Sequence, residues 1–188
     1  MRTATLSING LTPYSQSRAI QSSKEEKETY EQFDARIWPE HIHVDDDGQP
    51  IIPASGLLQC IAAGAAYLSK GGQLKKKGMA TWSENFLCGL AIARSPELVT
   101  PHEARAAKIY CHADGRRGSG KRVWRTFPQW DTWSAVVIIH ILDDSIPDEV
   151  FEQVVEAAGL FKGLGRFRPE NGGYLGRFTV TKVNIVSV

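Results

Sequence analysis

Apolar and polar residues alternate along several short stretches of the chain, which is the period of a β-strand with one buried face. The first such stretch is residues 3–8, where Ala4, Leu6 and Ile8 face one side and threonine or serine the other. Residues 133–142 are instead almost continuously apolar, which predicts a central strand covered on both faces. The other candidate strands are residues 86–93, 106–112 and 178–188.

Two further stretches carry apolar residues at the three- and four-residue spacing of an amphipathic helix. The first follows Ser55, a suitable N-cap, and ends at a pair of glycines. The second spans residues 145–158, with Ser145 as its cap and Gly159 as its end. The order strand, helix, three strands, helix, strand approximates the split βαβ arrangement. We therefore expect an α+β fold with a ferredoxin-like (RRM-like) antiparallel sheet and two packed helices.

Two insertions interrupt this order, and the length of 188 residues favours a single domain, residues 1–188. Residues 13–45 are polar and rich in serine, glutamate and lysine, which indicates a long N-terminal insertion or loop. Residues 113–130 contain turn signals and many cations, and we expect them to form a basic hairpin that projects from the sheet. Its basic residues are Arg116, Arg117, Lys121, Arg122 and Arg125.

The total charge does not identify a partner, because 22 basic residues against 21 acidic ones give a net charge of +1. Basic and acidic residues gather in separate segments, which permits one basic face. The three cysteines are widely spaced without a Cys-x-x-Cys pair, so we expect reduced core residues rather than disulfides or a zinc site. No apolar run has the length of a membrane span and no signal-peptide layout is present, so we expect a cytoplasmic protein without a membrane partner.

Glycine and arginine recur between residues 163 and 178, on either side of a glycine pair. Glycine suits backbone that takes a positive φ or approaches another molecule closely, and interleaved arginines indicate a polyanion. Backbone amides and arginines can hold phosphates there, and aromatic rings can stack on bases. The alternative is a long turn with solvated arginines. The candidate RNA contacts are Gly163, Gly165, Arg166, Phe167, Arg168, Gly172, Gly173 and Arg177.

Two other segments are candidate contacts. The cations of the hairpin lie next to Trp124 and Phe127, and each stacked base is worth about 1–3 kcal/mol in single-strand binding. The alternative is a flexible, solvated tip. Ser55 and its neighbouring amides at a helix start can attract an anion, although an ordinary N-cap needs no ligand.

Signals for catalysis or metal binding are few. His41 and His43 are two residues apart but lack a third ligand at a suitable spacing, so no metal is expected. His112 or His140 could act as the acid–base catalyst of a metal-independent ribonuclease. His140, however, lies inside an apolar strand, where a hydrogen-bonded core histidine is the better interpretation. Asp34 or one of Asp45 to Asp47 could be a catalytic acid, but the sequence around them does not match a recognisable catalytic loop, and turn formation or solubility explains them adequately.

Two segments together resemble a known family. Residues 47–58, Asp-Gly-Gln-Pro-Ile-Ile-Pro-Ala-Ser-Gly-Leu-Leu, combine a turn, a Pro-apolar-Ile-Pro step and a small-residue start to a helix. With the glycine-rich stretch after the second helix, they resemble the RAMP superfamily of CRISPR-associated proteins, and within it the crRNA-binding backbone subunits of Cascade-type effector complexes. That family has a ferredoxin-like palm, often with a projecting hairpin called a thumb. The chain departs from the pattern at Ala54 and Gln59, where the family usually has a glycine and a basic residue.

The resemblance implies a subunit without enzymatic activity or cofactor that binds single-stranded, crRNA-like RNA. It also implies assembly with other copies of the chain and with other effector subunits. Two alternatives remain: a metal-independent, guide-processing endoribonuclease of the same superfamily, or a mimic of a backbone subunit that acts as an assembly or inhibitory partner.

Overall fold

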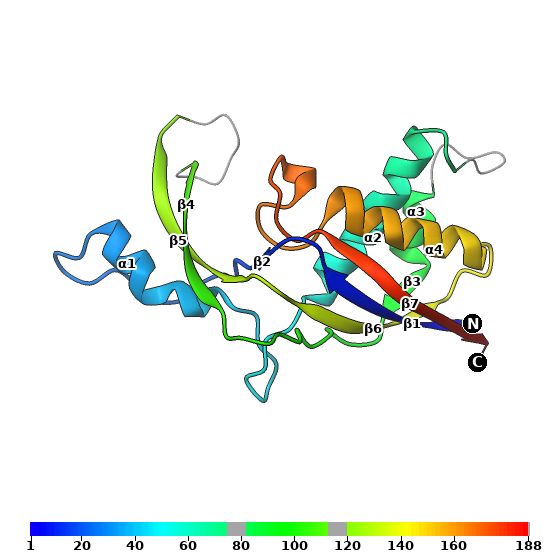
Figure 1. Cartoon of the computed structure of the whole chain (residues 1–188), viewed down its shortest axis with the longest axis horizontal. Helices are drawn as coiled ribbons and strands as arrows, with labels where there is room; N and C mark the ends of the chain where they lie inside the picture. Colours follow the sequence, from blue (N-terminus) through cyan, green and yellow to red (C-terminus); the bar gives the residue numbers. More distant parts are fainter. Residues whose placement is uncertain (75–81, 113–119, 188) are drawn as a thin grey trace.

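The computed structural model describes residues 1–74, 82–112 and 120–187, which form two antiparallel sheets (Figure 1). The larger sheet has four strands in the order β3-β6-β1-β7, and the smaller has three in the order β2-β5-β4. The strands of the larger sheet are β1 (Arg2–Gly10), β3 (Leu90–Ile92), β6 (Ser134–Ile141) and β7 (Phe178–Ser187). Those of the smaller sheet are β2 (Tyr14–Ser15), β4 (Arg105–His112) and β5 (Arg122–Trp130).

The larger sheet and two helices have ferredoxin-like topology, as predicted. Helix α2 (Ala54–Lys70) connects β1 to β3, and helix α4 (Asp148–Ala157) connects β6 to β7. Every neighbouring pair in this sheet is antiparallel, and both helices cover the same face (Figure 1). The sheet order is therefore second, third, first and fourth strand of a βαββαβ unit. Two strands of the smaller sheet, β4 and β5, are inserted between the second and third strands of that unit, and its third strand, β2, lies between β1 and α2.

The core lies between this sheet and its two helices. Ala4, Leu6 and Ile8 of β1 are buried, in agreement with the predicted alternation. Phe151 of α4 packs on them together with Phe86 of helix α3 (Ser83–Cys88). Full burial of each of these large side chains is worth about 1.5–3 kcal/mol relative to exposure.

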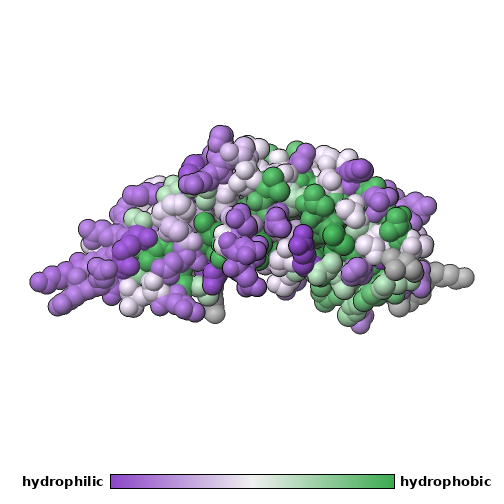
Figure 2. Space-filling model, turned by 90° about the horizontal axis from the view of Figure 1, so that it is seen from below, coloured by the Kyte–Doolittle hydropathy of each residue, from purple (hydrophilic) through white to green (hydrophobic). Residues whose placement is uncertain are grey.

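The opposite face of the larger sheet is not covered by a helix. β6 is central, as predicted, but Val136 is 56% exposed, so the prediction that both faces are covered is wrong. Seen from below (Figure 2), hydrophobic side chains gather at the end of the molecule that carries this sheet, and hydrophilic ones at the α1 end. A continuous apolar run did not distinguish a covered face from an open one, because alternate residues of β6 are apolar on both.

Neither long helix is capped by the serine that the sequence suggested. Pro53 is the N-cap of α2, and Ser95 Oγ accepts a hydrogen bond of 3.2 Å from the first helical amide. Ser55 lies inside the first turn and is exposed. Pro147 is the N-cap of α4, whereas Ser145 lies in the preceding turn. Proline fits these positions because its fixed φ is compatible with the residue before a helix.

Two other predicted boundaries are wrong. The chain does not leave the helical conformation at Gly159 but continues as a π-helix, Ala158–Lys162. A Cβ at Gly159 would overlap the carbonyl oxygen of Phe178, so this glycine permits close packing against β7. The predicted strand 86–93 is a strand only over Leu90–Ile92, because its first part belongs to α3.

The two insertions form one projecting unit (Figure 1). Residues 13–45 contain β2, helix α1 (Tyr30–Ile37) and a 3-10 helix (Trp38–His41). β4 pairs with β5 from Arg105 to the level of His112, so the hairpin is longer than expected and includes a strand predicted for the main sheet. The hairpin tip, with Arg116 and Arg117, lies outside the described residues. None of the helices in the described part of the chain is long and apolar enough to span a membrane.

Candidate nucleic-acid interface

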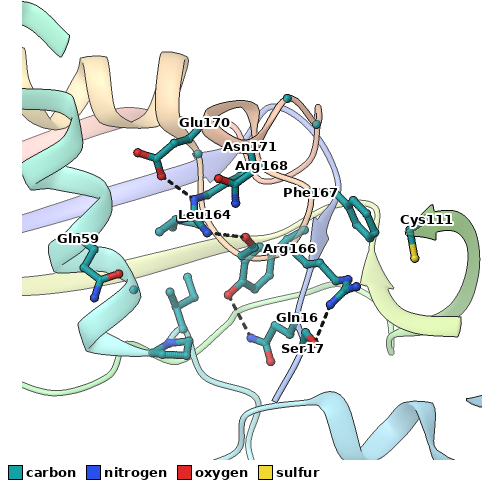
Figure 3. Close-up of a pocket in the computed structure, with 18 of the residues that line it drawn as sticks. Gln16, Ser17, Gln59, Cys111, Leu164, Arg166, Phe167, Arg168, Glu170 and Asn171 are labelled. Atoms are coloured by element: carbon teal, nitrogen blue, oxygen red, sulfur yellow. Dashed lines mark hydrogen bonds and ion pairs between the residues drawn. The ribbon is translucent and has the colours of Figure 1, made fainter. Parts of the chain in front are cut away.

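An open cavity of about 1020 Å³ lies between α2 and the β4–β5 hairpin (Figure 3). Segments far apart in the sequence line it: both ends of the insertion, the start of α2 with the residues before it, the adjoining ends of β4 and β5, and the glycine-rich loop after the π-helix. The predicted phosphate-binding loop and the predicted basic hairpin therefore border the same space.

The glycines of the loop are required by its own fold. A Cβ at Gly173 would overlap the carbonyl oxygen of Phe167, and one at Gly165 would overlap the carbonyl oxygen of Ser15. Several loop glycines also have φ values that side chains rarely adopt. Positive φ and the close approach of two parts of the chain account for these glycines, whereas the approach of a ligand to them stays a prediction. The glycines with positive φ in this loop are Gly163, Gly165, Gly172 and Gly176.

Many of the loop amides are already engaged within the protein. The amide of Arg166 donates to the carbonyl of Ser15 at 2.8 Å, and that of Gly176 donates to Pro13 at 2.7 Å. Among the described residues, the loop amides that donate to no backbone carbonyl include those of Gly165, Phe167 and Arg168. Fewer amides of this loop are therefore available to a ligand than the sequence suggested.

Arg166 is a cation held over aromatic rings at the edge of the cavity (Figure 3). Its guanidinium carbon lies 3.8 Å from the ring centroid of Phe127 and 4.8 Å from that of Phe167. Nη1 donates to Ser17 Oγ at 3.0 Å, whereas Nε is buried without a hydrogen-bond partner. No carboxylate within the described residues forms an ion pair with Arg166. Burial lowers the pKa of Arg166, but a guanidinium stays protonated in proteins.

Phe167 has a φ of 54°, which is uncommon for a residue other than glycine. Its ring also contacts Phe127 edge-on, with the centroids 6.2 Å apart. Backbone in this region costs free energy and is found preferentially at binding sites. The strained residue lies next to the arginine that has no carboxylate partner.

The other two arginines of the loop are bound by the protein. Arg168 Nε lies 3.0 Å from Glu170 Oε2, and Arg168 still lines the cavity. The guanidinium of Arg177 donates to the carbonyl of Leu160 in the π-helix, and Arg177 does not line the cavity. The structure therefore gives Arg177, a predicted RNA contact, a role in holding the π-helix.

Arg125 is likewise directed into the protein. Its guanidinium forms an ion pair with Asp34 of α1, whose carboxylate is buried. Asp34, considered as a catalytic acid, is thus occupied by a structural partner. Breaking a buried ion pair leaves an uncompensated charge, so this pair fixes α1 to β5.

The hairpin presents an exposed aromatic pair next to the cavity. Tyr110 of β4 and Trp124 of β5 lie opposite each other, with ring centroids 5.2 Å apart. They are 51% and 53% exposed, respectively. Tyr110 and Arg122 line the cavity, and Lys121 is exposed beside them. Tyr110 was not predicted as an RNA contact, because its position opposite Trp124 depends on how β4 and β5 pair.

The residues at the start of helix α2 that line the cavity do not include the predicted contact, Ser55. Pro53, Gly56 and Gln59 line the cavity, whereas Ser55 does not. Gln59 supplies a neutral amide there, at the position where the RAMP family usually has a basic residue. The start of α2 therefore adds polar surface to the cavity but no cation.

The insertion forms a hydrogen-bonded part of the cavity wall. Gln16 Nε2 donates to the carbonyl of Ile51 at 2.7 Å, and the amide of His43 donates to Gln16 Oε1 at 2.7 Å. Burial raises the pKa of Tyr14, which is a neutral phenol. Burial, together with the nearby charge of Arg18, lowers the pKa of His43, so its imidazole is neutral at pH 7. This wall could not be predicted from local patterns, since its residues become neighbours only on folding.

Among the described residues, the charged side chains that line the cavity are those of Arg122, Arg166, Arg168 and Glu170. This concentrates positive charge in a chain whose net charge is only +1. No group of three or more histidine, cysteine, aspartate or glutamate side chains in the described ranges could hold a metal ion. A cationic cavity flanked by exposed aromatic rings suits a polyanion with planar bases.

No known protein-family model matches the sequence, and no curated protein is detectably similar to it. Among solved structures, the chain is similar to a chain of the Type III-B Cmr-beta complex bound to cognate target RNA, with a TM-score of 0.55 and 14% identity. That match covers 99% of this chain and 61% of the other, so this chain spans less than two thirds of it. Cmr6 from Pyrococcus furiosus matches with a TM-score of 0.49 and 11% identity over 96% of this chain and 99% of Cmr6. The Cmr-beta match shows that this chain shares the fold of a chain found in a Type III-B complex.

Proposed function

We propose that this chain binds single-stranded RNA as a backbone-type subunit of a CRISPR effector-like ribonucleoprotein. The observation that carries the proposal is Arg166, whose guanidinium lies on Phe127 at the edge of an open cavity and has no carboxylate partner among the described residues. Desolvating such a cation without an ion pair is unfavourable unless a ligand supplies the negative charge.

Two kinds of side chain contact two different parts of the RNA. Arg166, Arg168 and Arg122 hold phosphates, while the Tyr110–Trp124 pair stacks on bases. Stacking and phosphate contacts do not read base identity, so affinity depends little on RNA sequence. The fold agrees with this proposal, since the Cmr-beta chain that shares it belongs to a complex bound to target RNA.

The proposed partners are crRNA-like RNA, other copies of this chain and other effector subunits. The resemblance of residues 47–58 and 163–178 to the RAMP family supports assembly along RNA. The exposed Tyr110–Trp124 pair lies on a projecting hairpin, where it can contact both RNA and a neighbouring subunit.

Arg166→Ala tests the proposal by fluorescence anisotropy with a labelled single-stranded RNA. A hydrogen bond to a charged group is worth about 1.5–3 kcal/mol, so we expect binding to weaken about 10- to 100-fold. Arg166→Lys should have an intermediate affinity, because it keeps the charge but not the planar stack. Arg94→Ala is the control, since Arg94 is exposed and lies outside the cavity lining. Unchanged affinity in Arg166→Ala, or no RNA binding by the wild type, would refute the proposal.

One observation favours the endoribonuclease as a second candidate. His43 and His112 both line the cavity, and the lowered pKa of His43 keeps it neutral and able to accept a proton. His140 does not line the cavity, and its Nδ1 lies 3.0 Å from the Thr3 hydroxyl. Cleavage of repeat RNA in the presence of a chelator, lost in His43→Ala or His112→Ala, would favour the enzyme. Intact RNA after prolonged incubation would exclude this candidate.

A further inference from the structure

The exposed side of α2 leads from the main cavity to a second, smaller one. Gln59 lines the main cavity, and Ala66, Tyr67 and Lys70 line a cavity of about 330 Å³ together with Lys162 of the π-helix. Gln59, Ala66 and Lys70 are separated by seven and four residues, about two turns and one turn, so they lie along one side of the helix. At 1.5 Å per residue, Tyr67 lies about 12 Å along the axis from Gln59.

Tyr67, which lines the smaller cavity, stacks on Phe161, and both rings are exposed. The ring centroids of Tyr67 and Phe161 are 4.8 Å apart with an interplanar angle of 28°. The rings are 42% and 45% exposed, which distinguishes the pair from a core contact. Lys162 Nζ lies 5.6 Å from the Tyr67 ring centroid. Phe161 and Lys162 both lie in the π-helix, a rare conformation that is frequent at functional sites.

The carboxylate of Glu170 bridges two cations, Arg168 at the main cavity and Lys162 at the smaller one. Glu170 Oε2 is 3.0 Å from Arg168 Nε, and its Oε1 is 3.9 Å from Lys162 Nζ. Gly163, the residue after Lys162, lines the main cavity. A strand that leaves the main cavity past Arg168 therefore meets Lys162 next and Lys70 beyond it.

We propose that Tyr67 and Phe161, with Lys70 and Lys162, form a second contact site for the same RNA strand. One nucleobase stacks on the Tyr67–Phe161 pair, and the two lysines bind the flanking phosphates. This inference rests on the proposed RNA-binding function and extends the path of the strand. Nucleic acid is favoured over a protein partner because the cavity is small enough for one planar base, and because aromatic rings with cations are typical of single-strand sites.

The test compares a short RNA of about 4 nucleotides with one of about 12, a range that covers known single-strand site sizes. Tyr67→Leu keeps an apolar contact with Phe161 but removes the stacking ring. We expect it to weaken binding of the long RNA about 5- to 100-fold and to leave the short RNA unaffected. Tyr67→Trp should retain wild-type affinity. Tyr30→Leu is the matched control, since Tyr30 is an exposed tyrosine with Lys24 Nζ 5.2 Å from its ring centroid on the distant α1.

A second measurement detects the stacked base directly. The base analogue 2-aminopurine, placed at successive positions of the long RNA, should be quenched at one position in the wild type, and Tyr67→Leu should abolish that quenching. Wild-type affinity of Tyr67→Leu for the long RNA, with no change in quenching, would overturn the second site and leave the main cavity intact. If that variant instead loses self-association in light scattering, the pair is a protein interface and the inference is wrong. Failure of the wild type to bind either RNA would remove the proposed function itself.

Discussion

The number of cavity arginines predicts how RNA affinity depends on salt. For single strands, the logarithm of the binding constant falls with the logarithm of salt concentration with a slope of about −0.7 per neutralised phosphate. Arg122, Arg166 and Arg168 line the cavity. If each neutralises one phosphate of a short RNA, the slope is about −2, and affinity falls about 20-fold between 50 and 200 mM salt.

Arg122→Ala is the most informative change, because Arg122 is exposed at the start of β5 and lines the cavity. Loss of one phosphate contact should reduce the slope to about −1.4 and the fall in affinity over the same range to about 7-fold. The assay is fluorescence anisotropy of a labelled RNA of about 4 nucleotides at several KCl concentrations. A longer RNA that also reaches Lys70 and Lys162 should give a steeper slope.

Two results would refute this reasoning. A slope that is the same in Arg122→Ala and the wild type would show that Arg122 does not neutralise a phosphate. A wild-type slope near zero would show that the cavity arginines do not bind the RNA backbone at all. Lys182→Ala on β7 is the control, because Lys182 is exposed outside the cavity lining and its loss should leave the slope unchanged.

Three further predictions concern stability and reactivity. Asp34→Ala should lower the free energy of unfolding by about 3–5 kcal/mol in urea titrations, because it leaves Arg125 without its buried partner. Gly173→Ala should lower the free energy of unfolding by about 1–3 kcal/mol, because the added Cβ would overlap the carbonyl oxygen of Phe167 in the same loop. Iodoacetamide at pH 8 should modify Cys88, which is exposed, and spare Cys60, because burial raises the pKa of the Cys60 thiol to about 12.

Each of these predictions has its own control. The double variant Asp34→Ala/Arg125→Met should recover much of the lost stability, and equal stability of the single and double variants would contradict the ion-pair argument. Gly56→Ala is the control for Gly173→Ala, since a Cβ at Gly56 meets nothing within 4 Å. This control variant should be at least as stable as the wild type. Rapid labelling of Cys60 in the native protein would show that its surroundings open far more often than its burial implies.

Local patterns were sufficient to predict the ferredoxin-like order, because strand and helix periods depend on neighbours in sequence. The buried alternation of β1, the helix α2 and the apolar face of α4 follow directly from side-chain spacing. The short helix α3 was missed, since so few residues give no clear period. The predicted strand 106–112 was correct as a strand but belongs to the smaller sheet, an assignment that depends on pairing with β5.

The roles of the arginines could not be separated from the sequence. Arg166 and Arg177 lie in the same glycine-rich stretch, yet one stacks on Phe127 and the other binds the carbonyl of Leu160. In the sequence, Arg125 is one of several cations of the hairpin. In the structure it forms an ion pair with Asp34, which lies far away along the chain. Each difference depends on which distant side chain or carbonyl comes within reach on folding, and no local pattern contains that information.

The ion pair between Asp34 and Arg125 makes the insertion and the hairpin interdependent parts. A graft that transfers the hairpin alone to a related scaffold would bring the arginine without its carboxylate, and one that shortens residues 13–45 would leave the same charge unmatched. The two segments must therefore be exchanged together, and substitutions at one of these positions are tolerated only when the other changes with it.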